Sequence, residues 1–583
     1  MSKLMRELVS KSAFVKVAQL EKLRLSGAAK PLMRLSGIEQ INRVYDRLHR
    51  LRGLDFVEGL IRTMEIEIEW DGKGLERIPT SGPFITISNH PFGLWDGLIL
   101  LKLFAKIRPD YKVMADFLLQ HVEPVGDLFI RATPGEGSAM PAGIDAVADH
   151  LAAGSPVGIF PAGEVSTFQR TSRQVTDPAW QRQILRLIQT AQVPVIPVYF
   201  EGSNSPFFHI MGMIHPSLRM AAIPQETLRK KKTKIRVRVG SPITVKEQQS
   251  VTGTDRLGRY LRARTYSLGS GLPVNRFFRP RFQFPVRQQA IAPETATHLI
   301  RREIEQLDPA SLICAQGEFE VYCARAAHIP HALQEIGRLR EITFREVGEG
   351  TGHACDTDEY DLYYHHLFLW DKDAGKIAGA YRMGPGDEIM LKYGKKGFYT
   401  HSLFKMQAAF EPYLHQAVEL GRSFILTDYQ RKRLPLFLLW KGIYTFLRQH
   451  EQYRYLIGPV SISNDYSPLS KSFIVAIIRR FYFDPTLASM IQPRKRFHPR
   501  LKHVDIDGLV EGIDGSDLKQ VDRVLEEIEP AHFKLPVLLK KYIRQNARII
   551  AFNVDPKFNH ALDGFMIMDL KDLPEATAEG MER

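Results

Sequence analysis

The sequence predicts an α/β fold in which two different α/β domains follow a basic helical N-terminal arm. Short apolar runs, each bounded by glycine, proline or polar residues, alternate with helical segments through both halves of the chain, as layered α/β folds require. At 583 residues the chain is too long for one hydrophobic core, and no internal repeat relates the two halves. We therefore expect two domains with different folds.

We expect the arm over residues 1–65, a first domain over 66–267, a linker over 268–295 and a second domain over 296–583. In the arm, lysine and arginine are interleaved with leucine, valine, methionine and isoleucine. This pattern is typical of a helix that lies on an anionic membrane, or of a helical cap packed on the next domain. The linker is rich in proline, glycine, arginine and phenylalanine and has no periodicity.

In the first domain the pattern predicts strands at Ile66–Trp70, Phe84–Ser88, Lys112–Ala115, Val157–Phe160, Val195–Phe200 and Lys234–Val239. Helices are predicted at Gly97–Ala105, Met140–Ala153, Trp180–Ala191 and 253–267. Strands of the second domain are predicted at Phe319–Ala324, His365–Asp371, Lys376–Arg382, Ser423–Asp428 and Tyr455–Val460. Its predicted helices are 296–307, 331–345, 404–421, 435–449 and 517–528, and the segment 534–554 closes the domain.

Composition narrows the function classes. The 79 basic and 65 acidic residues leave a net charge of +14, which suits an acidic partner such as an anionic lipid or an acidic carrier protein. Nucleic acid has only this charge in its favour, because no zinc-finger, RNP-like or helix-turn-helix pattern is present. Three cysteines cannot build a disulfide framework, and no apolar run approaches the ~20 residues of a membrane-spanning helix. With no signal-peptide pattern, we expect a cytoplasmic protein, soluble or peripheral on the inner face of the cytoplasmic membrane.

The segment Phe84–Asp96, FITISNHPFGLWD, carries the first candidate site. A strand ends at Ser88, Asn89 and His90 occupy the turn, and Asp96 opens the next helix. A histidine can take a proton from an attacking hydroxyl while a carboxylate fixes its tautomer. One histidine near one aspartate is equally compatible with a structural turn.

Three further segments follow in order: GDLFIR ending at Arg131, VGIFPAGEVS around Gly163, and VPVIPVY around Pro197. Together the four segments resemble the four blocks of the glycerolipid acyltransferases, the family of lysophosphatidate acyltransferase, over residues 65–245. The resemblance implies that His90 is the general base and Asp96 its orienting partner. It places Arg131 and Gly163, with Asn89, in the acceptor-binding blocks.

Two departures from the family pattern bear on the acceptor. The first block has five intervening residues where the family has four, and Gly93 can absorb the extra one. The third block has Ala162 in place of the family's glutamate, with Glu164 one residue beyond the glycine. Glu164 is either an acceptor contact or an acid at a helix N-terminus. The reaction type is expected to persist, with a different lysolipid as acceptor.

The second candidate site lies in residues 338–428, which are dense in ionisable side chains. Its pattern is Arg-x3-Phe, Asp-x2-Asp, Gly-x-x-Arg at a strand end and Glu-x2-Arg near a helix end, carried by Arg340, Phe344, Asp358, Asp361, Arg382, Glu419 and Arg422. A carboxylate can accept the proton of an attacking amine. The same groups are also compatible with a buried network of structural ion pairs. Adjacent His365 and His366 would point to opposite faces of a strand, so no metal site is expected.

This order resembles the GNAT-related acyl-homoserine-lactone synthases, and residues 296–560 resemble the hemolysin-like GNAT branch that makes lyso-ornithine lipid. The resemblance implies an active-site network of the seven residues, with Glu419 as the base that accepts the amine proton. The lactone synthases' tryptophan and the Gly-rich loop of coenzyme-A-binding GNAT proteins have no match. This favours acyl carrier protein over coenzyme A as acyl donor, and no bound cofactor is expected.

The combination resembles the bifunctional ornithine-lipid synthases of bacteria. The resemblance implies that the second domain N-acylates ornithine or a similar amino acid with a 3-hydroxyacyl group and that the first domain O-acylates the resulting lysolipid. Glycine, serine and lysine remain open as acceptors. Two alternatives also stay open: a lysophospholipid acyltransferase with an accessory GNAT-like domain, and a non-catalytic membrane-binding protein of the hemolysin-like kind.

Overall fold

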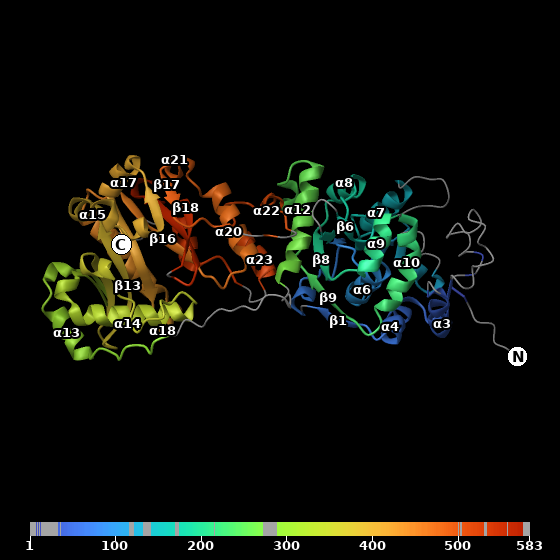
Figure 1. Ribbon diagram of the computed structural model, residues 1–583, viewed down its shortest axis with the longest axis horizontal. Coiled ribbons are helices and arrows are strands. Elements are labelled where there is room, and N and C mark those ends of the chain that lie inside the picture. Colours follow the sequence, from blue (N-terminus) through green and yellow to red (C-terminus); the bar gives the residue numbers. More distant parts are fainter. Residues whose placement is uncertain are drawn as a thin grey trace. The chain divides into compact units, whose positions relative to one another are not determined.

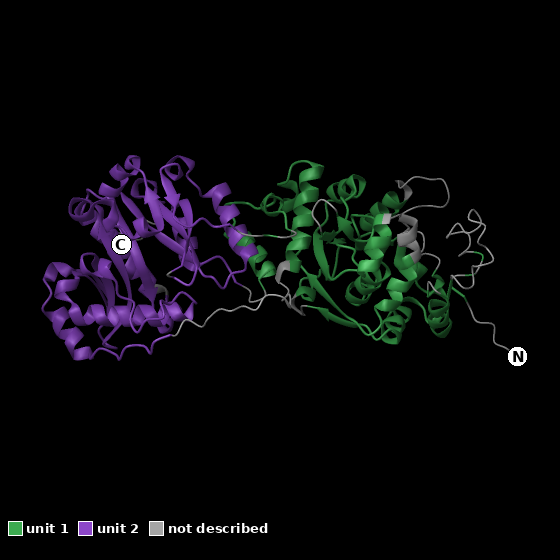
Figure 2. Ribbon diagram, in the orientation of Figure 1, with its two compact units in different colours: residues 1–273, 501–532 green, residues 274–500, 533–583 purple. Residues whose placement is uncertain are grey.

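The computed structural model describes residues 37–70, 72–115, 122–131, 141–169, 174–214, 216–271, 288–498, 504–529, 533–556 and 558–574, with a few isolated positions besides. Figure 1 shows the helices and strands in chain order. The chain divides into unit 1, residues 1–273 and 501–532, and unit 2, residues 274–500 and 533–583 (Figure 2). Each unit contains its own large sheet with helices, which confirms the predicted fold class of two different α/β domains.

Unit 1 is built on a seven-stranded sheet in the order β1-β9-β8-β2-β5-β3-β4. Its strands are β1 (Glu67–Trp70), β2 (Ile85–Ser88), β3 (Lys112–Ala115), β4 (Phe129–Arg131), β5 (Val157–Ile159), β8 (Val195–Glu201) and β9 (Lys234–Val239). The strands from β8 to β4 are parallel, and β9 is antiparallel to β8. The carboxyl ends of the parallel strands therefore meet at one edge, where open α/β sheets bind their ligands.

Helices cover both faces of this sheet. One apolar cluster joins it to α3 (Ile38–Leu48), α4 (Gly53–Thr63) and α6 (Leu94–Phe104), and the other joins it to α7 (Pro141–Ala152), α8 (Arg182–Ala191) and α12 (Thr254–Ser267). Phe56 and Val57 of α4 are buried in the first cluster. For residues 38–63, this placement favours the helical cap over the membrane-surface arm. Most of the arm before residue 37 lies outside the described residues.

Two helices from late in the chain belong to unit 1, although the sequence placed them in the second domain. They are α22 (Ile506–Val510) and α23 (Leu518–Ile528). Glu527 of α23 pairs with Arg264 of α12 at 2.9 Å, and both side chains are almost completely buried. The same carboxylate accepts the Ser241 N–H at 2.9 Å. A buried pair of this kind is set by tertiary contact and leaves no local signal in the sequence.

Unit 2 is built on an eight-stranded sheet in the order β10-β11-β12-β13-β15-β16-β19-β18. Its strands are β10 (Leu312–Gln316), β11 (Phe319–Arg325), β12 (His365–Asp371), β13 (Lys376–Pro385), β15 (Ala417–Ile425), β16 (Tyr455–Ile462), β18 (Arg548–Asp555) and β19 (Ala561–Asp569). All neighbours are antiparallel except β15 and β16, which pair in parallel only from Ala417 to Glu419. Beyond this point β15 pairs with β13 alone and β16 with β19 alone.

The main helices of unit 2 are α13 (Thr297–Glu305), α14 (Pro330–Glu346), α19 (Arg433–Gln449), α20 (Pro468–Phe481) and α24 (Val537–Arg544). The predicted helix 404–421 is wrong. The segment forms β14 (Phe404–Met406), the short helix α17 (Glu411–His415) and the first part of β15. Pro412 fits only the first turn of a helix because it has no N–H to donate, and Val418 is buried in the centre of the sheet.

Among the described residues, none of the helices combines the length and the apolar composition that crossing a membrane requires.

Candidate active sites

The first candidate site begins where β2 ends, at the edge formed by the parallel strands. The Asn89 side chain is fully engaged by the neighbouring strand β8. Its Nδ2 donates to the Phe200 carbonyl at 2.9 Å, and the Phe200 N–H donates to its Oδ1 at 2.8 Å. Asn89 was predicted to bind substrate. In the structure its side chain bonds to β8 and fixes the turn that carries His90.

The structure brings His90 and Asp96 together. His90 Nδ1 lies 2.9 Å from Asp96 Oδ2, and the same oxygen accepts the backbone N–H groups of Phe92 and Gly93 at 2.8 and 3.0 Å. Gly93 has a φ of +68°, which glycine adopts without strain, and α6 begins directly after it. This backbone geometry lets a spacing of five residues close the histidine–aspartate contact.

The environment of the pair suits a general base. Burial raises the pKa of Asp96, and the hydrogen bonds from His90 and the backbone oppose that effect. With Asp96 accepting from Nδ1–H, the other ring nitrogen, Nε2, is left as an acceptor. The His90 ring stacks on Phe160 at a centroid distance of 4.0 Å, and its side chain is 18% exposed. The imidazole is therefore oriented, supported and accessible.

Asp177 organises the site and was not predicted. Its Oδ1 accepts the His90 N–H at 3.1 Å and the Ser166 hydroxyl at 2.5 Å, and its Oδ2 accepts from Trp180 at 3.3 Å. The Ser166 N–H also donates to the His90 carbonyl at 2.8 Å. Asp177 thereby ties the first block to the third. In the sequence, Asp177 precedes Pro178, a pattern that indicates a turn and nothing about a site.

The remaining predicted residues of this site lie around the third block and β4. Gly163 has a φ of +69°, a left-handed conformation that favours glycine, and a Cβ there would meet the side-chain amide of Gln181. Glu164 follows it and is exposed. Arg131 ends β4, and its side chain lies outside the described residues. Lys230, which was not predicted, places its Nζ 4.2 Å from the centre of the Phe92 ring.

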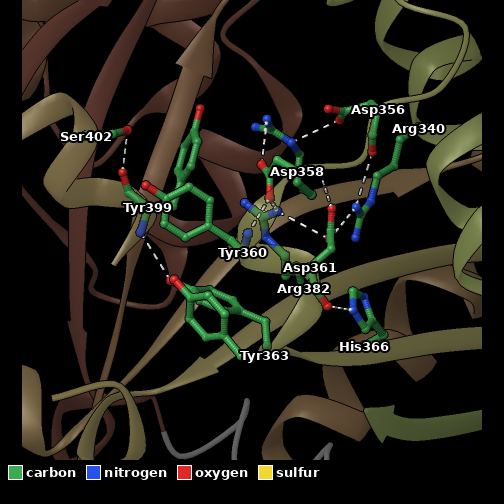
Figure 3. A network of polar contacts seen from close by, with 12 residues as sticks. Arg340, Asp356, Asp358, Tyr360, Asp361, Tyr363, His366, Arg382, Tyr399 and Ser402 are labelled. Carbon is green, nitrogen blue, oxygen red and sulfur yellow. Dashed lines mark hydrogen bonds and ion pairs between the residues drawn. The ribbon is translucent and has the colours of Figure 1, made fainter. Parts of the chain in front are cut away.

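The second candidate site is a network of three arginines and three aspartates in unit 2 (Figure 3). The arginines come from α14, β13 and β15, and the aspartates from the loop before β12; they are Arg340, Arg382, Arg422, Asp356, Asp358 and Asp361. Arg340 and Arg382 approach Asp361 Oδ1 at 2.8 and 3.3 Å. Arg382 also reaches Asp358 at 2.5 Å, and Arg422 approaches Asp356 at 2.9 Å and Asp358 at 3.4 Å.

This network is buried and closely paired. Burial would raise the pKa of Asp361, but the charges of Arg340 and Arg382 hold it below its usual value. Arg422 has a φ of +49° at an irregularity in the β13–β15 register. Its guanidinium lies between the rings of Tyr399 and Phe558, 4.8 and 4.9 Å from their centres. Phe344, the phenylalanine of the predicted site, packs edge-on against Phe558 and so lies next to the ring that contacts Arg422.

Glu419 lies on β15 and not near a helix end, which corrects the predicted setting of Glu419 and Arg422. It is 1% exposed. Its carboxylate accepts the backbone N–H groups of Tyr399 at 2.9 Å and Thr400 at 2.7 Å, together with the Tyr364 hydroxyl. Burial raises the pKa of Glu419, and these donors oppose it. The Glu419 side chain thus fixes the start of α16 (Tyr399–Leu403), and the first residue of this helix, Tyr399, packs on Arg422.

Two family models match this chain. One, described as an acyltransferase, matches residues 15–274, and the other, described as an acetyltransferase (GNAT) domain, matches residues 339–440. The first match lies almost entirely in unit 1, and the second lies in unit 2.

Curated relatives are similar to parts of this chain. A glycine N(alpha)-acyltransferase of Phocaeicola vulgatus is 31% identical over 36% of this chain, and the match spans 66% of that protein, just under two thirds. A second protein of that name, from Bacteroides thetaiotaomicron, is 32% identical and is matched over about half of its length, 52%. A lyso-glycine lipid O-acyltransferase of Phocaeicola vulgatus is 26% identical over 33% of this chain and 69% of its own length.

Among solved structures, the 1-acyl-sn-glycerophosphate acyltransferase PlsC of Thermotoga maritima is 15% identical to this chain, with a TM-score of 0.25. The match covers 43% of this chain and 93% of that one.

A group of acidic residues in unit 2 was missed by the sequence reasoning. Glu349, Asp555 and Asp563 are buried carboxylates from three separate segments. Asp563 interrupts the apolar run of β19, and an acid inside a buried strand is a signal that could have been noticed.

Proposed function

We propose that this acyltransferase builds an acylated amino-acid lipid in two steps. The GNAT domain transfers a 3-hydroxyacyl group from a thioester to the amine of an amino acid, and the acyltransferase domain then acylates the 3-hydroxyl of that product. The observation that carries the proposal is that one chain matches both an N-acyltransferase and a lysolipid O-acyltransferase of the same lipid class. Ornithine, expected from the sequence, and glycine, named in the relatives, are the first acceptors to test.

The geometry at His90 supports the second step. His90 Nε2 takes the proton of the 3-hydroxyl while Nδ1 donates to Asp96. The oxygen attacks the thioester carbon, the C–S bond breaks, and the protonated imidazole returns the proton to the departing thiolate. Lys230, beside the turn at Phe92, offers a positive charge to the free carboxylate of an amino-acid lipid.

Acyl carrier protein is the proposed donor. Leu391 is 85% exposed and Leu362 73% exposed, and the rings of the nearby Tyr393 and Tyr363 are in contact, with their centres 4.4 Å apart. Lys392 and Lys396 follow Leu391 in the chain and are exposed. This apolar and basic surface suits a small acidic protein that presents an acyl chain. An assay that offers carrier-protein and coenzyme A thioesters side by side decides between the two donors.

Membrane attachment is also proposed, on the inner face of the cytoplasmic membrane. Helix α9 (Pro206–Ile214) follows β8 and exposes Phe207, Ile210 and Met213 by 48%, 49% and 42%. These positions repeat every three residues, so they share one side of the helix. Arg229 of α10 (Pro216–Arg229) donates to Ser205 at the start of α9 and is followed by three lysines. An apolar helix side near a basic run suits an anionic bilayer.

Expression in a host that lacks aminolipids, followed by lipid mass spectrometry, tests the proposal. We expect a new diacylated amino acid from the unaltered chain. His90→Ala should stop the second step and make the monoacylated product accumulate, because general-base catalysis contributes about 10²–10⁴-fold. His150→Ala is the matched control, since His150 Nε2 lies 3.1 Å from the Asp110 carbonyl, just before the start of β3, whereas His90 follows the end of β2. Diacylated product from His90→Ala, or no acylated amino acid at all, would contradict the proposal.

A further inference from the structure

Three buried carboxylates gather on one face of the unit 2 sheet. In the strand register Asp563 of β19 lies between Ser461 of β16 and Asn553 of β18. Paired residues point to the same face, so Asp563 shares its face with Ser461 and also with Asp555, two residues beyond Asn553. The Ser461 hydroxyl donates to Glu349 at 3.0 Å, which brings Glu349 to this face as well.

This acidic group adjoins the arginine–aspartate network. The Tyr399 hydroxyl donates to Asp555 at 3.4 Å, and the Tyr399 ring packs on the Arg422 guanidinium. Besides burial, the charges of Asp555 and Glu349 raise the pKa of Asp563, and the charge of Arg422 lowers it. Besides burial, the charge of Asp465, in the loop after β16, raises the pKa of Glu349. The acidic group therefore lies beside the predicted active-site residues of the GNAT domain.

The ion pairs of the two groups differ. The three arginines of the network pair with Asp356, Asp358 and Asp361, whereas no described lysine or arginine forms an ion pair with Glu349 or Asp563. Asp563 is 5% exposed, and its Oδ2 is buried with no hydrogen-bond donor among the described residues. An unpaired buried carboxylate is costly, and such groups cluster at functional sites. The missing partner is a cationic donor.

We propose that Glu349, Asp555 and Asp563 form the amine site of the GNAT domain, where they hold the ammonium group of the acceptor and Asp563 takes its proton. The inference rests on the proposed function. It assigns the base to Asp563 in place of Glu419, whose oxygens already accept three hydrogen bonds. Burial raises the pKa of Asp563 well above its usual value and that of Glu349 to about 7, which suits groups that accept protons near neutral pH.

The acceptor ammonium gives one proton to the Asp563 carboxylate, and the resulting amine attacks the thioester carbon. The new C–N bond forms, the C–S bond breaks, and the nitrogen loses a second proton as the departing thiolate is protonated. Asp563 then releases its proton to solvent.

Steady-state N-acylation by the full chain, with glycine and with ornithine as probes, tests the assignment. Asp563→Asn should lower kcat by about 100-fold or more and remove the acidic limb of the pH profile. Asp555→Asn and Glu349→Gln should raise KM for the amino acid. Asp569→Asn is the matched control: it removes a carboxylate from the same strand, where Asp569 pairs with Arg454. Unchanged kinetics in Asp563→Asn, with an active unaltered chain, overturn this inference alone. A chain that acylates neither amine overturns the proposed function too.

Thermal unfolding separates this role from a structural one. Because burial raises the folded-state pKa of Asp563, its protonation stabilises the fold at low pH, and that stability is lost as pH rises through the raised value. Asp563→Asn should therefore raise the Tm by about 2–4 °C at pH 8 and leave it unchanged near pH 4. A lower Tm at both pH values would show a structural carboxylate and overturn the inference.

Discussion

At the scale of single residues, Glu419 shows how a buried carboxylate can serve a site without touching substrate. It receives two backbone N–H groups at the start of α16 and the hydroxyl of Tyr364. Those bonds fix Tyr399, which packs on Arg422 and donates to Asp555. Its placement is therefore that of a positioning residue between the arginine–aspartate network and the acidic group.

Glu419→Gln tests this role. A glutamine must turn its NH2 group toward a backbone N–H or the tyrosine hydroxyl, so we expect the free energy of unfolding to fall by about 1–3 kcal/mol in urea titrations of the full chain. Glu411→Gln is the control, because Glu411 forms a partly exposed pair with Lys395 and should change stability by less than about 1 kcal/mol. A loss of N-acylation of 100-fold with unchanged stability would instead support Glu419 as the base.

The histidine–aspartate contact could be predicted because both residues lie in one local segment, at the end of a strand and the start of a helix. The short motifs of the second site contained five of the six residues of the arginine–aspartate network, all except Asp356, and the family resemblance implied that those five meet. Asp177 and Asp563 could not be placed similarly. Asp177 reaches His90 across 87 positions, and Asp563 meets Ser461 only through strand pairing. Contacts of this kind depend on the tertiary fold.

At the scale of elements, buried strands with clear boundaries were predicted well: the bounds of β3, β9 and β12 agree with the expected ones. The error over 404–421 arose because β15 lies in the centre of the sheet and is buried on both faces over Ala417–Leu420, so its sequence lacks the alternation that marks a half-buried strand. Periodicity alone does not separate such a run from a buried helix.

Helix α9 carries the prediction for membrane binding. Phe207→Ser combined with Ile210→Ser should weaken co-sedimentation with anionic vesicles at least tenfold, because each buried apolar side chain contributes about 1.5–3 kcal/mol. Leu51→Ser is the control, since Leu51 is 37% exposed as a single residue elsewhere in unit 1. If the double variant sediments like the unaltered chain, α9 is not the membrane contact.

At the scale of the whole molecule, the two units are not successive stretches of chain. Unit 1 is completed by residues 501–532, which return after most of unit 2 has been formed. Helix α23 buries Leu518, Val521, Val524, Leu525 and Ile528, and its Glu527 neutralises Arg264. A cut at the linker therefore leaves unit 1 with an unpaired buried arginine and uncovered apolar surface.

We accordingly expect residues 1–273 alone to be less stable than the same residues joined to 501–532 by a flexible linker. Removing one partner of a buried pair costs about 3–5 kcal/mol, and the lost apolar contacts add to this. Soluble yield and Tm of the two fragments measure the difference. In the full chain, Glu527→Gln should reproduce part of the loss, whereas Glu58→Gln, which breaks an exposed pair with Lys106, should cost about 0–1 kcal/mol. Equal stability of both fragments would show that α22 and α23 pack on unit 1 without supporting it.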